Sequence, residues 1–193
     1  MLKIFTEEDI KFRYIEPTLE KTGWKLEQIY KEYYFTDGQI IVRGKTVKRG
    51  KGKKADYILT HKEGDIPLAI IEAKSGEFSI GSGMQQAIDY AQILDIPFAY
   101  STNGEGFIEH DFFTGKEKEL KLEEFPKEDE LWDRYLKGKN LNTKQEEIIT
   151  EPNHFDTFTK KKPRYYQRIA IDRTVEAIAK GQKRILLVMA TGE

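Results

Sequence analysis

Two acidic side chains and a lysine stand at the ends of two neighbouring segments that have the pattern of β-strands. The first segment, "DYILTH", begins at Asp56, and the second is the apolar run 66–71, which ends in Glu72 and Lys74. Because successive side chains of a strand alternate between its faces, Glu72 and Lys74 point to the same side. A hairpin turn within "KEGD" would place Asp56 nearly opposite Glu72. The spacing therefore predicts two carboxylates and one ammonium group at one open end of a sheet.

This arrangement predicts a particular chemistry. Two carboxylates a few ångströms apart repel each other unless a cation neutralises them, and Mg²⁺ is a hard cation that carboxylates hold. A metal there lowers the pKa of a bound water and offsets the charge that develops on a phosphodiester. Lys74 can position the attacking water or stabilise the transition state electrostatically. The predicted reaction is Mg²⁺-dependent hydrolysis of phosphodiester bonds.

The acid-x-lysine spacing is not specific by itself. This highly charged chain contains it three times, at Asp9–Lys11, Glu72–Lys74 and Glu119–Lys121. Only the second instance ends an apolar run and follows a strand that begins with an aspartate. The alternative interpretation is a pair of ordinary strand-end charges in a surface salt bridge, which contributes little to stability.

A predicted helix after the second strand carries further polar side chains. Gln86 and Tyr90 are four residues apart and therefore share one face, with Gln85 nearby. Ser82 is placed to cap this helix, which runs to about Leu94. Beside the acids, the amide and the phenol could bind DNA phosphates or hold the lysine and the water. The alternative is a polar helix surface with a partly buried tyrosine.

A basic segment immediately precedes Asp56. The chain as a whole has a formal net charge of −1, but "RGKTVKRGKGKK" contains basic residues and no acid. Such a run is either a solvated loop or an edge that attracts phosphates to the acidic site. In the second interpretation the DNA-binding residues are Arg43, Lys45, Lys48, Arg49, Lys51, Lys53 and Lys54.

Composition limits the other classes of site. The 193-residue chain has no cysteine and only three scattered histidines, so a divalent metal would have to be held by carboxylates. No apolar stretch approaches the roughly 20 residues that span a bilayer, and the N-terminus lacks a signal-peptide pattern. We therefore expect a cytoplasmic protein without a membrane partner.

The surrounding segments predict an α/β fold. Thr6 can cap a helix that kinks before Pro17 and ends near Gly23. Residues 39–48 predict a strand that runs into the basic segment. "PFAYSTN" and "GFIEHDFF" predict two more strands joined by a turn at "NG".

The later part of the chain changes in character. A charged helix around residues 127–137 is followed by a polar stretch without a sustained period. From Pro163 the pattern is helical again as far as Gly181, and "RILLVMATGE" predicts the start of a buried strand. The predicted organisation is a domain over 1–137, a linker over 138–162 and the beginning of another domain over 163–193.

Taken together, these blocks resemble a known family. "AD" at 55–56, "EAK" at 72–74 and "QAIDY" at 86–90 look like the PD-(D/E)xK nuclease core with its QxxxY helix. More closely, the chain resembles the N-terminal part of the HsdR motor and restriction subunit of type I restriction-modification enzymes. "TEEDIKFRYIEPTLEKTGW" looks like its opening helix, and "IIVRGKTVKRGKGKKADYIL" its approach to the first catalytic acid. "PRYYQRIAIDRTVEAIAKGQKRILLVMATG" looks like the start of its superfamily 2 helicase motor. The resemblance covers nearly the whole chain, with the blocks in the family's order.

The resemblance implies a restriction-endonuclease-like fold with a central mixed β-sheet flanked by helices. The first helix and strand of a truncated superfamily 2 helicase domain would follow. Asp56 and Glu72 would be the metal-binding acids and Lys74 the catalytic lysine. Gln86 and Tyr90 would be the supporting pair of the QxxxY helix.

Other positions match the family singly. Glu7 corresponds to an acidic position that in related nucleases can reach the metal, although it could equally complement the helix dipole. Gln167 resembles the motor's adenine-reading glutamine, with a solvated helix residue as the alternative. Thr191 and Gly192 would begin the ATP phosphate loop. The family continues into Gly-Lys-Ser/Thr, whereas this chain ends at Glu193, so we expect no ATP hydrolysis by this fragment. Ala55 replaces the proline of the motif name but supplies no metal ligand.

The function implied is that of a type I site-specific deoxyribonuclease: cleavage of double-stranded DNA with Mg²⁺, coupled in the full subunit to ATP-driven translocation. Methylase (M) and specificity (S) subunits would be its partners. One alternative is a standalone repair or Holliday-junction nuclease of the same superfamily. Another is a catalytically inactive module that docks to DNA or to a methylase.

Overall fold

A mixed six-stranded sheet forms the centre of the computed structural model, which describes residues 4–36, 40–43, 46–49, 52–62, 66–151 and 163–188. The strand order is β1-β4-β5-β6-β7-β8, and only β5 and β6 run parallel. The strands are β1 Ile29–Thr36, β4 Lys53–His61, β5 Ile66–Ala73, β6 Phe98–Thr102, β7 Phe107–Asp111 and β8 Lys116–Leu120. The predicted α/β class is confirmed.

Strands β4 and β5 form the predicted antiparallel hairpin. Tyr57 pairs with Ile71 and Leu59 with Ala69, and the register then shifts by one residue, so that Thr60 pairs with Pro67. Leu68, Ile70 and Ile71 are completely buried, as a run covered on both faces of a sheet should be. The apolar pattern of β5 therefore reflects its central place in the sheet.

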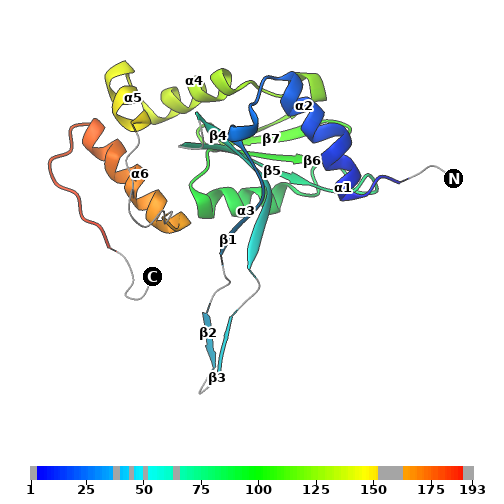
Figure 1. Cartoon of the computed structure of the whole chain (residues 1–193), viewed down its shortest axis with the longest axis horizontal. Coiled ribbons are helices and arrows are strands. Elements are labelled where there is room, and N and C mark those ends of the chain that lie inside the picture. Colours follow the sequence, from blue (N-terminus) through cyan, green and yellow to red (C-terminus); the bar gives the residue numbers. More distant parts are fainter. Residues whose placement is uncertain are drawn as a thin grey trace. The chain divides into compact units, whose positions relative to one another are not determined.

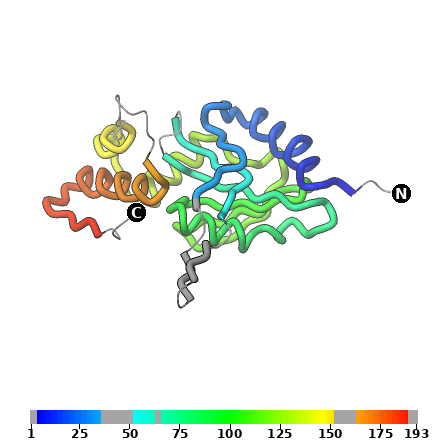
Figure 2. The backbone as a smooth tube through the Cα atoms, turned by 60° about the horizontal axis from the view of Figure 1, so that its bottom comes forward, coloured from blue at the N-terminus to red at the C-terminus, as the bar shows by residue number. Residues whose placement is uncertain are grey.

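Helices cover both faces of this sheet (Figures 1 and 2). On one face, α1 Glu7–Ile10 continues through a π-helical stretch, Lys11–Ile15, into α2 Glu16–Lys21. Ile10, Ile15 and Leu19 are buried along this helix, and Pro17, which has no N–H to donate to the preceding turn, lies just after the π-helical stretch. On the other face lies α3 Met84–Leu94.

Helix α3 packs closely on the sheet because small residues face it. Ala87 and Ala91 are completely buried against β5 and β6. The prediction that Ser82 caps this helix is wrong. Gly83 is the N-cap residue and no side chain caps the helix, whereas the Ser82 hydroxyl is hydrogen-bonded to that of Ser79 at 2.9 Å. The Ser82 hydroxyl is therefore engaged in a local turn and does not cap the helix.

Some strands differ from the prediction. The expected single strand over 39–48 consists of two short strands, β2 Ile40–Arg43 and β3 Thr46–Arg49, which pair with each other. Strand β1 and the charged edge strand β8 were not predicted. An edge strand exposes most of its side chains, so β8 lacks an apolar period.

The chain divides into two compact units, residues 1–135 and 136–193. Helix α4, Glu128–Lys139, spans the division in sequence. The second unit contains α5 Thr143–Thr150 and α6 Tyr165–Ala179. Helix α5 lies within the stretch predicted as a linker, and its capping box at Asn142 and Gln145 is the signal that the periodicity analysis missed.

The predicted buried strand after α6 is wrong. Ile185 to Val188 have no strand conformation, and Leu186 and Val188 are 88% and 81% exposed. A buried strand needs neighbouring strands for its backbone hydrogen bonds, and residues 185–188 pair with no strand in the described part of the chain. Among the helices the structure describes, none has the length and apolarity of a membrane span.

Candidate active site

The structure brings Asp56 and Glu72 together at the same end of the β4–β5 hairpin. The pairing of Tyr57 with Ile71 makes Asp56 and Glu72 the next opposed pair along the ladder. Both are buried, at 5% and 1% exposed. The Ala73 N–H donates to Oδ2 of Asp56 at 2.9 Å, which fixes the aspartate across the strand ends. Two acids thus share a space from which water is largely excluded.

Gln86 links Glu72 to Lys74. Its Nε2 donates to Oε2 of Glu72 at 2.7 Å, and its Oε1 accepts from Nζ of Lys74 at 3.1 Å. Helix α3 supplies Gln86, and the end of β5 supplies the two charged residues. The predicted common side of Glu72 and Lys74 is therefore confirmed by their shared partner.

The electrostatics of the pair are unfavourable without a cation. Burial, and then the negative charge of Asp56, raise the pKa of Glu72 to about 8, although the positive charge of Lys74 opposes the shift. Oε1 of Glu72 is buried and has no hydrogen-bond partner among the described residues. A buried carboxylate oxygen without a donor is the feature that a metal ligand would leave.

Tyr90 lies on the same helix, one turn beyond Gln86. Its ring packs edge-on against Phe35 of β1 at 5.1 Å, and Nζ of Lys53 lies 5.6 Å from its centre. Burial and the charge of Glu72 raise the pKa of the Tyr90 phenol. Tyr90 therefore stays neutral and can donate a hydrogen bond toward the site.

The loop between β5 and α3 is pinned beside the acids by residues that the sequence analysis missed. The Gly83 N–H donates to Oγ of Ser101 at 3.1 Å, and the same hydroxyl donates to the Ile80 carbonyl at 2.7 Å. A Cβ at Gly83 would lie 2.9 Å from that Oγ, 3.3 Å from Cε of Lys74 and 3.4 Å from Cβ of Glu72. Only the absence of a side chain allows this close approach.

Glu7 does not join Asp56 and Glu72. Its carboxylate lies 3.5 Å from Nζ of Lys11, and the described residues contain no group of three or more metal-binding side chains. Lys11 instead reaches Asp56, with Nζ 2.7 Å from Oδ1. Burial alone would lower the pKa of Lys11, but its bonds to Asp56 and Glu8 raise it above the ordinary value. The contact between Lys11 and Asp56 could not be predicted from a local pattern, because the two residues are 45 positions apart in the sequence.

The basic segment is only partly described. Lys53 and Lys54 begin β4, and Lys54 forms an ion pair with Glu32 and lies over the ring of Tyr34 at 5.8 Å. Of the other predicted DNA-binding residues, the backbones of Arg43, Lys48 and Arg49 lie in β2 and β3, while Lys45 and Lys51 lie outside the described residues.

Of the residues predicted to bind ATP, only Gln167 lies among the described residues. Gln167 caps its own helix, because its Oε1 accepts from the Arg164 N–H at 2.9 Å. Thr191 and Gly192 lie outside the described residues.

Comparison with known proteins places the chain in a family. The family described as "Type I restriction enzyme R protein N terminus (HSDR_N)" matches residues 22–126, a range that contains Asp56, Glu72, Lys74, Gln86 and Tyr90. The chain belongs to this family. A second family, "Type III restriction enzyme, res subunit", matches residues 160–193 of this HSDR_N protein.

Two curated relatives are similar over nearly all of the chain. The type I restriction enzyme EcoAI endonuclease subunit of Escherichia coli is 45% identical over 99% of the chain, which corresponds to 24% of that subunit. The EcoKI endonuclease subunit of Escherichia coli strain K12 is 24% identical over 97% of the chain and 20% of that subunit. The HSDR_N chain thus spans about a quarter or less of these relatives.

A solved structure shares the whole architecture. It is a fragment assigned to an HsdR subunit of a type I restriction enzyme from Vibrio vulnificus YJ016. The identity is 41% and the TM-score 0.84, over 98% of the present chain and 35% of the solved chain. The six-stranded mixed sheet flanked by helices is therefore the fold of an HsdR fragment.

Proposed function

We propose that the first unit is the Mg²⁺-dependent endonuclease domain of a type I restriction enzyme R subunit, with a PD-(D/E)xK core that hydrolyses DNA phosphodiester bonds. One observation carries the proposal: Asp56 and Glu72 are buried side by side at adjoining strand ends, and Gln86 ties Lys74 to them. The relatives named as endonuclease subunits support the same activity.

The side chains present fit a divalent metal. Asp56 and Glu72 would hold it, because their carboxylates repel each other and Oε1 of Glu72 has no other partner in the described chain. Glu7 would join them only after leaving Lys11. When bound, Mg²⁺ would supply a water of lowered pKa and positive charge beside the scissile phosphate.

The protein's own residues would position the reactants. The Lys74 ammonium is held by Gln86 and keeps two further N–H donors for the attacking water or a phosphate oxygen. Tyr90, kept neutral, would donate to the water or to a DNA phosphate. Gln86 would act through its two bonds, as a positioning residue for Lys74 and Glu72.

DNA would approach along the start of β4. Lys53 and Lys54 directly precede the site, and the rest of the basic segment precedes them in the chain. Contacts of lysine and arginine with phosphates fix position but carry no sequence information. Sequence choice would therefore come from the partner specificity subunit, with the methylase subunit completing the complex on double-stranded DNA.

In the full subunit, cleavage would be coupled to ATP-driven DNA translocation. The match of residues 160–193 to a restriction-enzyme res subunit family supports the beginning of such a motor. Gln167 would then contact the adenine, and Thr191 and Gly192 would begin the phosphate-binding loop.

Cleavage by the parent subunit tests the proposal. With its methylase and specificity partners, Mg²⁺, ATP and unmodified DNA, Asp56→Ala and Lys74→Ala should each reduce cleavage by at least about 100-fold. ATP hydrolysis should continue, because the motor is separate in sequence from both residues.

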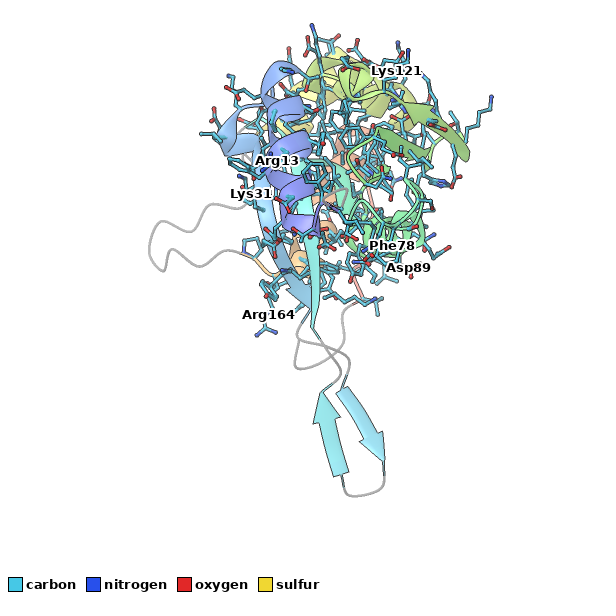
Figure 3. The ribbon with its side chains drawn as sticks, turned by 90° about the vertical axis from the view of Figure 1, so that its right-hand side faces the viewer. Arg13, Lys31, Phe78, Asp89, Lys121 and Arg164 are labelled. Atoms are coloured by element: carbon cyan, nitrogen blue, oxygen red, sulfur yellow. The ribbon has the colours of Figure 1, made fainter. Side chains whose placement is uncertain are left out.

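The matched control is Lys121→Ala, which removes the lysine of another acid-x-lysine pair. Lys121 directly follows the edge strand β8, whereas Lys74 follows the interior strand β5, and Figure 3 shows Lys121 above Phe78, a residue of the loop between β5 and α3. Cleavage should be unchanged by Lys121→Ala. Wild-type cleavage by Lys74→Ala would contradict the assigned roles. Cutting of branched DNA by the 193-residue chain without nucleotide would favour a standalone nuclease instead. Absence of carboxylate-dependent Mg²⁺ or Mn²⁺ binding in calorimetry would favour an inactive docking module.

A further inference from the structure

Lys11 is a buried lysine surrounded by carboxylates. It is 6% exposed, and its Nζ lies 3.5 Å from Glu7, 3.0 Å from Glu8, 2.6 Å from Glu32 and 2.7 Å from Asp56. Lysine is almost never buried without paired charges. The π-helical stretch begins at Lys11, so the helix that carries this lysine is irregular at that position.

The acids that Lys11 contacts continue a row across the sheet. Position 32 of β1 lies between the pairs Lys31–Tyr57 and Tyr33–Ala55, which sets Glu32 opposite Asp56. Asp56 in turn lies opposite Glu72. We call Glu32, Asp56 and Glu72 the acidic row. Like charges directly opposite each other on neighbouring strands are destabilising, so the row needs a cation.

The backbone at Glu32 is unusual as well. Its φ of +53° lies in the left-handed region, which a residue with a side chain adopts at an energetic cost inside a strand. In this conformation the Glu32 carboxylate accepts from the Lys11 ammonium and forms an ion pair with Lys54. The structure therefore supplies Lys11 with a second strong acceptor next to Asp56.

Asp56 has no oxygen left without a partner. Oδ2 accepts the Ala73 N–H and Oδ1 accepts the Lys11 ammonium. A divalent cation that binds Asp56 shares Oδ1 with the ammonium, displaces the ammonium, or binds Oδ2 of the same carboxylate beside the Ala73 N–H. In each case it approaches a positive charge in a site with little water to screen the repulsion.

We propose that Lys11 is the resident counter-ion of the acidic row: it competes with a divalent cation for Asp56, is received by Glu8 and Glu32 when the cation binds, and thereby weakens metal affinity. The proposal rests on the proposed metal-dependent nuclease site. Lys11 acts through Asp56 and is a positioning residue. Lys11 thus neutralises Asp56 before the metal arrives, and the same contact weakens metal binding.

Metal titration tests the proposal without an activity assay. Mn²⁺ binding to the 193-residue chain is measured by electron paramagnetic resonance of the free ion and by calorimetry. Lys11→Met should bind Mn²⁺ at least about tenfold more tightly than wild type, because the competing charge is gone. Lys11→Arg keeps the charge and should stay within a few-fold of wild type.

The matched control is Lys31→Met. Lys31 also loses an ion pair, at 2.6 Å, but its partner is Glu16 and not the acidic row. Its Mn²⁺ affinity should be that of wild type. A general loss of structure would weaken binding, so tighter binding by Lys11→Met cannot come from damage to the fold.

Glu32→Gln should change the Mn²⁺ affinity in the opposite direction. It removes the negative charge that stabilises Lys11 when the ammonium leaves Asp56, so Mn²⁺ binding should weaken, and this loss should shrink in the Lys11→Met background. Asp56→Asn in the otherwise wild-type chain should abolish Mn²⁺ binding. If it does, but Lys11→Met binds Mn²⁺ no more tightly than wild type, the proposed role of Lys11 is wrong while the metal site stands. Absence of Asp56-dependent binding in every variant overturns the metal site as well.

Discussion

At the scale of residues, the candidate site is a local excess of buried negative charge. Asp56 and Glu72 are almost inaccessible to water, and two lysines from different elements approach them. Asp56 is fully bonded, whereas Glu72 keeps one carboxylate oxygen with no hydrogen-bond partner in the described residues. The free-energy cost of burying the carboxylate is therefore offset by bonds at Asp56 but largely not at Glu72.

Replacement of Glu72 should accordingly stabilise the metal-free protein. In EDTA at about pH 9, where the carboxyl is ionised, Glu72→Gln should raise the melting temperature by about 2–4 °C, or about 1 kcal/mol for a chain of this size. The amide removes the repulsion from Asp56 and can still accept from Gln86. Asp56-dependent Mn²⁺ binding should be lost at the same time.

Glu109→Gln is the matched control, because Glu109 is a buried glutamate with good partners. Arg134 donates to both its oxygens, at 3.0 and 2.7 Å, and Tyr100 donates at 2.5 Å. Removal of that charge should lower the melting temperature. A lower melting temperature for both variants would show that Glu72 is stabilising and contradict our account of its burial.

At the scale of elements, the loop from β5 to α3 determines how Lys74 and Glu72 are held. Ser101 of β6 binds the loop at Ile80 and Gly83, and α3 then begins directly beside the site. The position of Gln86 one turn into α3 depends on that starting point.

Gly83→Ala should disturb this junction. The backbone at Gly83, with φ −90° and ψ −6°, accepts alanine, so the effect comes from contact of the new Cβ with Ser101 and Lys74. We expect a loss of stability of about 1–3 kcal/mol and weaker Mn²⁺ binding, measured by thermal melts and by calorimetry.

Gly76→Ala in the same loop is the control. Its Cβ would meet only Phe5, at 3.8 Å or more, which is ordinary van der Waals contact. Its melting temperature and Mn²⁺ affinity should match wild type. Equal behaviour of the two variants would contradict a close-packing role for Gly83.

At the scale of the whole molecule, the two units differ in what stabilises them. The first unit has a sheet with completely buried strands. In the second, α6 has no buried residue, and Glu176 accepts from Lys139 at 3.0 Å and from Lys180 at 2.5 Å. Ion pairs thus carry a larger share of the stability of the second unit.

The second unit should therefore lose helix first on acidification. Burial alone would raise the pKa of Glu176, but the bonds from Lys180 and Lys139 lower it below the ordinary 4.5. A lowered pKa in the folded state adds stability above the unfolded value, which is lost as pH falls through the folded value. The contribution is about 1 kcal/mol or less.

Two spectroscopic signals separate the units. Both tryptophans, Trp24 and Trp132, belong to the first unit. As the pH falls from about 5 to 3, the helical circular dichroism signal at 222 nm should decrease before tryptophan fluorescence changes. This early decrease should be absent in Glu176→Gln. A single coincident transition in wild type would contradict the expected difference.

The β4–β5 hairpin was predictable because its signals are local. Alternation along β5 predicts that Glu72 and Lys74 share a side, and the short turn predicts that Asp56 lies near Glu72. A register shift between Leu59 and Thr60, which no local pattern predicted, sets the two acids directly opposite each other. The helical period likewise predicts α3 and the face that carries Gln86 and Tyr90. These relations involve residues that are near in sequence, so a pattern can contain them.

Other features depend on contacts between distant segments. Lys11 reaches Asp56 and Glu32 only because the π-helical stretch after α1 lies beside β1 and β4, and nothing at residues 7–11 indicates those partners. The apolar run at 185–188 has the pattern of a buried strand but no neighbour to pair with among the described residues. The sequence by itself determined which charges stand at the strand ends. Tertiary structure alone decided how those charges are balanced, because Coulomb energy depends on distance in space and on the exclusion of water.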